Sequence, residues 1–141
     1  MKYAKWMMAL TLTLAPMLAS AQLSSSQKLK ADVPFEFEVG NRMIPAGECT
    51  VRTGTMDGKS IVVHNIDAST SLFSSISTDE MKTAAANYAL VFNKYGDRYF
   101  LSGIKLEGSR VMHRLPQSKA EAELRAANVT STQEILLASL Q

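Results

Sequence analysis

Two segments of the sequence have the pattern of a β-hairpin, and this pattern restricts the fold more than any other feature. In the first, residues 33–39 read VPFEFEV, so valine and phenylalanine alternate with proline and glutamate. Alternation predicts a strand with one buried face, because successive side chains of a strand point to opposite faces. Gly40-Asn41 then predicts a two-residue type II′ turn, since glycine tolerates the required positive φ. Ile44-Pro45-Ala46-Gly47 predicts a second turn, of type I, before a strand containing Cys49 and Val51.

The second hairpin, over residues 88–107, is predicted to turn at Gly96-Asp97. This turn pairs Tyr95 with Arg98 and, three residues further from the turn on each strand, Phe92 with Leu101. One face then carries Leu90, Phe92, Tyr99 and Leu101, and the other carries Val91, Phe100 and Ile104. Apolar residues on both faces predict a central hairpin that is covered on each side.

The rest of the chain adds short strands and a change of character near the end. Strands are predicted at 59–66, 70–77 and 109–115, with 78–87 a loop or one helical turn. After Pro116, Ser118 and Glu121 have the spacing of a capping box, in which each satisfies the other's backbone donor, so 120–127 is predicted to be helical. For residues 134–140 a short helix is favoured, and an edge strand is the alternative.

Together these patterns predict a mainly β fold in one domain. The expected architecture is a single antiparallel β-sandwich or small β-barrel of about 7–8 strands, with a short C-terminal helical segment. The β domain is expected over 32–116, with a helical segment over 117–141 packed against it. Residues 22–31 are polar and serine-rich, which predicts a flexible leader.

The first residues have the form of an export signal. Lys2 and Lys5 precede an apolar stretch over 6–18, and Ala19-Ser20-Ala21 matches the small-residue pattern cut by a signal peptidase. Cleavage is predicted after Ala21, which makes the protein periplasmic or secreted.

Charge and composition exclude several partners of the mature chain. Removing 21 residues from 141 leaves 120, and losing Lys2 and Lys5 reduces the 15 basic residues to 13, equal to the 13 acidic ones. A neutral domain has no electrostatic footprint for nucleic acid or for an anionic membrane surface. No membrane span is expected once the signal is cleaved, and the cofactor expectation is none.

Cys49, the single cysteine, is the sharpest candidate for chemistry. Its position on the same strand face as Val51 predicts a buried, inert thiol; a thiol crosslink between chains and a catalytic nucleophile are the alternatives. A nucleophile needs a base nearby, and His64 and His113 are the only histidines, neither within a recognisable cysteine-hydrolase motif. Isolated Cys and His residues also lack the close spacing of a structural zinc site, so neither a metal site nor a catalytic site is expected.

The two hairpin segments carry a resemblance to a protein family. VPFEFEVGNRMIPAGECTV (33–51) and LVFNKYGDRYFL (90–101) resemble a family of short exported β-rich proteins of soil bacteria, chiefly acidobacteria. The resemblance covers about residues 31–125 and implies an exported β domain without implying an activity. Cys49 departs from the family pattern, in which an aromatic residue such as tyrosine is usual, and this argues against a shared role for the thiol.

Three classes of function follow from these observations. The first is a non-catalytic exported β domain that binds another component of the cell envelope, such as an envelope protein. The residues expected to form its docking surface are Ile135, Leu136, Leu137 and Leu140. The second is a carrier that holds a small apolar ligand in a cavity lined by Phe35, Phe37, Phe92 and Phe100. The third is an enzyme that uses Cys49. The absence of a recognisable catalytic motif favours the first.

Overall fold

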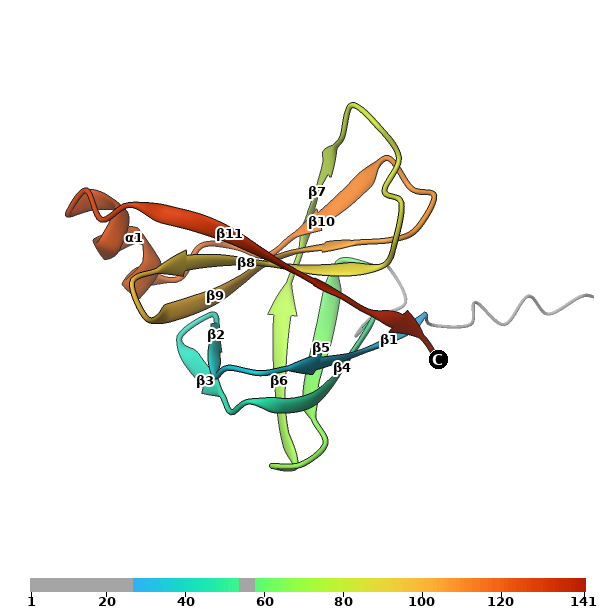
Figure 1. The fold of residues 1–141 in the computed structure, drawn as a ribbon, viewed down its shortest axis with the longest axis horizontal. Helices are drawn as coiled ribbons and strands as arrows, with labels where there is room; N and C mark the ends of the chain where they lie inside the picture. The colour runs from blue at the N-terminus through green and yellow to red at the C-terminus, as the bar shows by residue number, and fades with distance from the viewer. Residues whose placement is uncertain (1–26, 54–57) are drawn as a thin grey trace, which may run out of the picture.

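The computed structural model of this protein describes residues 27–53 and 58–141, which form two packed β-sheets and one short helix (Figure 1). Sheet A contains β12 (Ser139–Leu140), β1 (Lys28–Val33), β4 (Gly47–Thr53), β5 (Ser60–Asn65) and β6 (Thr70–Ser75), in that order. Sheet B contains β11 (Ser131–Leu137), β8 (Ala89–Tyr95), β9 (Arg98–Lys105), β10 (Val111–Arg114) and β7 (Ser77–Glu80), with β2 (Phe37–Val39) and β3 (Arg42–Ile44) attached beside β9. The helix α1 spans Lys119–Ala126. The predicted signal segment lies outside the described residues.

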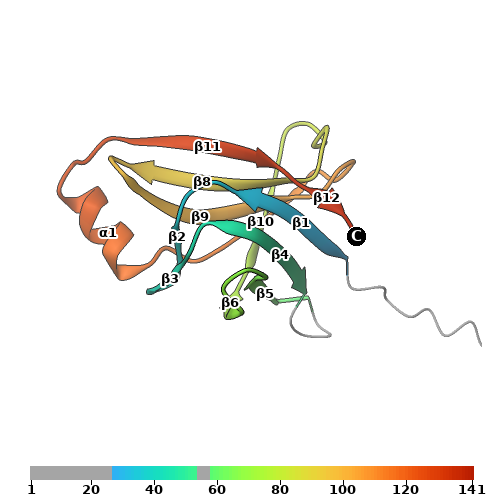
Figure 2. The same ribbon diagram turned by 60° about the horizontal axis from the view of Figure 1, so that its bottom comes forward.

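The two sheets are joined at both edges by strands that pass from one sheet into the other. Ile76 alone separates β6 in sheet A from β7 in sheet B, and Ala138 alone separates β11 in sheet B from β12 in sheet A. Both linking residues pack against the buried core. Strands that switch sheets in this way form the corners of a sandwich, and Figure 2 shows β11 running into β12 beside β1. The predicted mainly β sandwich is therefore confirmed, although the described residues form 12 strands where about 7–8 were predicted. The segment 78–87 was predicted to be a loop or one helical turn, but its residues 78–80 belong to β7.

Aromatic rings fill the space between the sheets. Phe37 and Phe92 are fully buried, and their ring centroids lie 5.2 Å apart in an edge-to-face arrangement. Phe35 contacts the edge of Phe92 at 5.1 Å and stacks on Tyr99 at 3.7 Å. Burying each such side chain stabilises the fold by roughly 1.5–3 kcal/mol, so this cluster is a main source of stability.

The first predicted strand is in fact two strands in different sheets. β1 ends at Val33 in sheet A, and β2 begins at Phe37, where it pairs with β9 of sheet B. Pro34 cannot donate a backbone hydrogen bond, so the ladder ends there. The alternation of buried residues continues through the break because the chain crosses beside the core, and Phe35 packs against it.

The two predicted hairpin turns are confirmed. Gly40 and Gly96 have φ values of 61° and 58°, conformations that glycine adopts without the penalty of a β-carbon. Beyond the second turn Tyr95 pairs with Arg98. Phe92 also pairs with Leu101, as predicted.

A β-bulge changes the far end of this hairpin. The register shifts between Val91 and Phe92, so Leu90 pairs with Ile104. Ile104 therefore lies on the inner face with Leu90, and its predicted place beside Val91 and Phe100 was wrong. An unpaired residue is the general consequence of a bulge, and here it is Ser102, whose hydroxyl donates to the Val91 carbonyl.

The connection between β3 and β4 is held by two side chains from the end of β5. Asn65, which is fully buried, donates from Nδ2 to the carbonyl of Pro45 at 2.7 Å and accepts from the backbone of Ala68 at 2.8 Å. Asp67 accepts from the backbone N–H of Glu48 at 3.0 Å. Gly47 has a φ of 141°, and a β-carbon there would lie 2.5 Å from the Asp67 carboxylate. Only glycine fits this position.

Both ends of the described domain differ from the prediction. Lys28–Val33 forms β1, which lies between β12 and β4, so the flexible leader predicted for 22–31 is wrong from residue 28 onward. The segment 134–140, predicted to be helical, forms most of β11 and all of β12, which was the weaker alternative. Long-range pairing with β8 outweighs the local helix preference. The helix predicted at 120–127 is confirmed as α1, and no helix of the described residues has the length and apolarity to cross a membrane.

Candidate functional site: the outer face of sheet B

The outer face of sheet B, which points away from the core, is half covered by the chain and half open. Alternate residues of β8 point outward, and their side chains run from Ala89 at one end to Tyr95 at the other. Helix α1 lies over the Tyr95 end. The Ala89 end is bordered by β11 on one side and by the loop over residues 81–88 on the other.

The covered half is organised around a buried carboxylate, Glu121 of α1, which is 5% exposed. Its Oε1 accepts hydrogen bonds from Asn93 Nδ2 at 2.8 Å and from the Tyr95 hydroxyl at 3.1 Å. Burial, and then the hydrogen bond to Glu121, raise the pKa of Tyr95. We call these three side chains the Glu121 cluster. Because they come from the helix and from β8, the cluster fixes the helix on the sheet.

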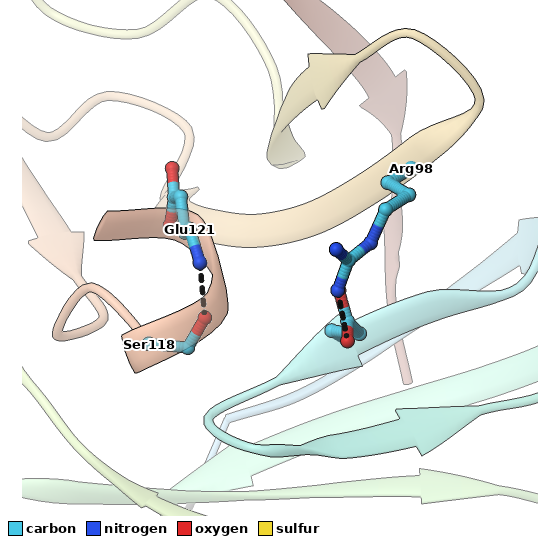
Figure 3. A network of polar contacts seen from close by, with 4 residues as sticks. Arg98, Ser118 and Glu121 are labelled. Atoms are coloured by element: carbon cyan, nitrogen blue, oxygen red, sulfur yellow. Dashed lines mark hydrogen bonds and ion pairs between the residues drawn. The ribbon is translucent and has the colours of Figure 1, made fainter. Parts of the chain in front are cut away.

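The capping box predicted at the start of α1 is present in one half. The Ser118 hydroxyl accepts from the backbone N–H of Glu121 at 3.1 Å, as expected for an N-cap serine. Figure 3 shows this bond. The Glu121 carboxylate serves the bonds to β8 described above, so a residue predicted to close its own helix also connects the helix to the sheet.

An ion pair between β9 and β2 supports the same face. Arg98 Nη2 lies 2.9 Å from both carboxylate oxygens of Glu38, whose side chain is 13% exposed. The guanidinium also lies 5.2 Å from the centre of the Phe100 ring. The pairing of Glu38 with Arg98 joins β2 to β9. Figure 3 shows Arg98 reaching from β9 toward β2.

The open half contains a groove with a volume of about 520 Å³, which we call the β11 groove. The residues that line it are Met81, Thr83, Ala84, Ala85, Ala86, Asn87, Ala89, Lys105, Ile135 and Leu137. Its surface is mainly apolar, with Lys105 as its charged residue. Ile135 is 52% exposed and Leu137 is 68% exposed. A concave apolar surface of this size falls within the range of protein binding sites.

The loop wall of the β11 groove is held in place by backbone hydrogen bonds. The N–H of Ala85 donates to the Ser109 carbonyl at 3.0 Å, and the N–H of Gly108 donates to the Ala85 carbonyl at 2.9 Å. Met81 donates to the Arg110 carbonyl at 2.7 Å. At the β11 side, Ala138 donates to the Tyr88 carbonyl at 2.9 Å. Both walls are therefore built by the fold before any ligand arrives.

The structure separates the four residues predicted to form a docking surface. In the strand β11, Ile135 and Leu137 point outward into the groove, whereas Leu136 between them packs against the core. Leu140 is 47% exposed but belongs to β12 and pairs with Leu29 in sheet A. Two of the four therefore share one surface. The alanine wall was not singled out from the sequence, because its contribution depends on a loop fold that has no local signature.

Cys49 is fully buried, as predicted, and faces the core from β4. Burial, together with the negative charges of Asp67 and Asp32, raises the pKa of the thiol to about 11. The thiol is therefore protonated at neutral pH, and a protonated thiol is a poor nucleophile. Its burial also keeps it from a second chain, so both the crosslink and the catalytic alternative would require the core to open.

The two histidines lie apart from Cys49. His64 Nδ1 lies 2.7 Å from the Ser71 hydroxyl on the neighbouring strand. His64 pairs with Thr50 across the sheet, so these two side chains share a face of sheet A. Cys49 precedes Thr50 in β4, and its thiol therefore points to the opposite face. His113 lies on β10, where its Nδ1 is buried without a hydrogen-bond partner among the described residues. Within residues 27–53 and 58–141, no group of three or more His, Cys, Asp or Glu side chains is arranged to hold a metal ion.

The four phenylalanines proposed to line a carrier cavity do not share one space. Phe35 and Phe37 each contact Phe92 ring to ring between the sheets. Phe100 points to the outer face of sheet B, where its ring centre lies 5.7 Å from that of Tyr95. A pocket of about 50 Å³ lies at one end of the core, with His113 among its lining residues. It has room for little more than a water molecule or two.

Comparison of the chain with protein-family models, with curated proteins and with solved structures found no match. The resemblance to the exported proteins of soil bacteria therefore stays a prediction.

Proposed function

We propose that this protein is an exported, non-catalytic binding module, and that it binds an apolar segment of another envelope protein in the β11 groove. The observation that carries this proposal is the groove itself. It combines two exposed aliphatic side chains, Ile135 and Leu137, with a wall of small alanine side chains. Hydrogen bonds hold that wall before binding, which lowers the entropic cost of association.

The chemistry of the groove favours an apolar peptide segment as the ligand. The alanine side chains of residues 84–86 leave room for larger side chains of a partner, and Ile135 and Leu137 provide apolar area to bury. Lys105 at the groove supplies one positive charge. A partner with an acidic residue beside a short apolar run would complement all three features.

Export is the second part of the proposal, and it rests on the pattern of residues 1–21. Recovery of the chain from the periplasm with Gln22 as its first residue, read by N-terminal sequencing, is the expected result. A cytoplasmic chain that retains Met1 would contradict export without bearing on the groove.

Site-specific photocrosslinking tests the groove in the cell. A photoreactive amino acid placed at Leu137 is expected to give a discrete adduct with an envelope protein. The same group at Glu123, exposed on the outer side of α1, is the matched control and should give none. The Ile135→Glu substitution should abolish the adduct at Leu137. Equal crosslinking at both positions, or an adduct unaffected by Ile135→Glu, would contradict the proposal.

Native mass spectrometry of the purified chain distinguishes the carrier alternative. A monomer at its calculated mass is the result expected for a binding module separated from its protein partner. Added mass from a small apolar molecule would favour the carrier, and loss of that mass in the Leu137→Glu variant would place the molecule in the β11 groove.

A further inference from the structure

Strand β6 forms an edge of sheet A that lacks the usual protection against pairing. Within the described residues it pairs along its length with β5 alone. Its sequence, TSLFSS over Thr70–Ser75, contains no charged residue and no proline, and its pairing register is continuous, without a bulge. Natural edge strands usually carry a charge, a proline or a bulge that prevents another strand from adding to them.

The side chain at the centre of this edge is also unusual. Phe73 is 63% exposed on the outer face of sheet A. Its neighbours Leu72 and Ser74 point inward and are buried. The inner face of the strand therefore packs against the core, while the Phe73 ring lies in solvent. The edge lies on the other sheet from the β11 groove (Figure 1).

The ladder between β5 and β6 determines which backbone groups face outward. The N–H of Ile76 donates to the Lys59 carbonyl at 2.9 Å and continues the β5–β6 register. In an antiparallel pair, alternate residues direct both backbone groups to the same neighbour. The backbone N–H and C=O groups of Ser74, Leu72 and Thr70 therefore point toward β5. The backbone groups of Ser75, Phe73 and Ser71 point away from it, to the open edge.

We propose that β6 pairs with β6 of a second copy of this chain, antiparallel and centred on Phe73, so that two copies of sheet A become one continuous sheet. A two-fold axis perpendicular to the sheet reverses the strand direction and keeps the outer faces on one side. Phe73 then lies opposite the second copy's Phe73, and Ser71 lies opposite the second copy's Ser75. Each of these pairs joins residues whose backbone groups face the open edge.

The exposed phenylalanine side chain selects Phe73 as the centre of the strand pair. Centres on Leu72 or Ser74 would place Phe73 opposite a serine and leave both phenylalanine rings without an aromatic partner. The centre on Phe73 brings the two exposed rings into a cross-strand pair, an arrangement that stabilises antiparallel sheets. No side chain of β6 has to change direction, because the inward-pointing residues stay in the core.

Sedimentation equilibrium of the whole purified chain tests the oligomeric state. A monomer–dimer equilibrium is expected, and Phe73→Lys should weaken the dimer at least tenfold by placing two like charges opposite each other. Met43→Lys replaces another exposed apolar residue, 48% exposed on β3, and should change the dimer less than twofold. A wild-type chain that stays monomeric up to about 1 mM, or a dimer equally sensitive to both substitutions, would overturn the proposal.

Disulfide trapping tests the register independently of stability. In a backbone-paired register the two Cα atoms opposite each other lie near 5.5 Å, a separation that a disulfide spans. The Phe73→Cys variant is therefore expected to form a covalent dimer under mild oxidation, since Cys49 is buried. In the Ser75→Cys variant the new thiols lie opposite Ser71, four residues apart along the strand, and should not crosslink. Equal crosslinking of the two variants would overturn the register.

Discussion

The two faces of the β8–β9 hairpin are both apolar in sequence, but the chain covers them in different ways. Its inner face contacts sheet A, and Phe92 there is fully buried among other aromatic rings. Its outer face is covered by α1 at one end and leaves Ile135 and Leu137 of the adjoining strand exposed at the other. The comparison indicates that the inner face provides stability, whereas the open part of the outer face is available for binding.

The largest expected effect is on the inner face. The Phe92→Ala substitution should lower the free energy of unfolding by about 3–5 kcal/mol, because it removes a buried ring and leaves a cavity. Urea unfolding followed by circular dichroism measures this change. Met43→Ala, at an exposed position of β3, should change stability by less than about 0.5 kcal/mol. A small loss for Phe92→Ala would mean that the aromatic cluster is not the main source of stability.

The covered part of the outer face should be the next most sensitive. Glu121→Ala removes the acceptor of two buried hydrogen bonds and leaves the donors of Asn93 and Tyr95 without it. A loss of about 2–3 kcal/mol is expected. Glu123→Ala, on an exposed position of the same helix, provides the control. If the two substitutions gave equal losses in the same urea assay, the Glu121 cluster would have no special role in attaching α1.

The inner face also predicts a pH dependence through Cys49. Burial first, and then Asp67 and Asp32, raise the thiol pKa from 9.0 to about 11. The folded state keeps the thiol proton to a higher pH than the unfolded chain. The stability contributed by this proton is therefore present below pH 9 and is lost as the pH rises from 9 through about 11, a loss of at most about 3 kcal/mol.

Comparison with a Cys49→Ala variant isolates this effect, since other groups titrate in the same range. Urea unfolding of both proteins at several pH values between 8 and 11 should show a steeper fall for the wild type. Parallel curves would mean that the thiol pKa is not raised in the folded state.

The smallest effect is expected where the outer face is open. Leu137→Ser should change the free energy of unfolding by about 0.5 kcal/mol or less, because the side chain is 68% exposed. The same substitution should reduce photocrosslinking from an amino acid placed at Ile135 in the cell. A large loss of stability would instead assign Leu137 to the structural part of the face and would weaken the proposed binding role.

The sequence predicts those parts of the fold that depend on neighbouring residues. The turns at Gly40 and Gly96, the pairing of Tyr95 with Arg98 and the Ser118 cap all follow from local backbone requirements, and the structure confirms them. The two-sided burial of the central hairpin also followed from its composition.

The features that were missed depend on residues far apart in the chain. β11 is a strand because it pairs with β8, about forty residues earlier. The residues of β11 alone do not indicate that pairing. Glu121 bonds to residues 26 and 28 positions away, so its role on the sheet has no local pattern. The bulge at Ser102, where the register shifts between Val91 and Phe92, has no signature in the turn, and it places Ile104 on the inner face.

The same long-range pairing affects when the domain can assemble. Leu29 of β1 pairs with Leu140 of β12, and Gln141 donates its backbone N–H to the Lys28 carbonyl at 2.8 Å. Contacts between residues so distant in sequence form late and slowly in folding. While residues 139–141 are still in the ribosome, the contacts between β1 and β12 cannot form. Closure of this edge of sheet A therefore waits for a segment far downstream of β1 in the chain.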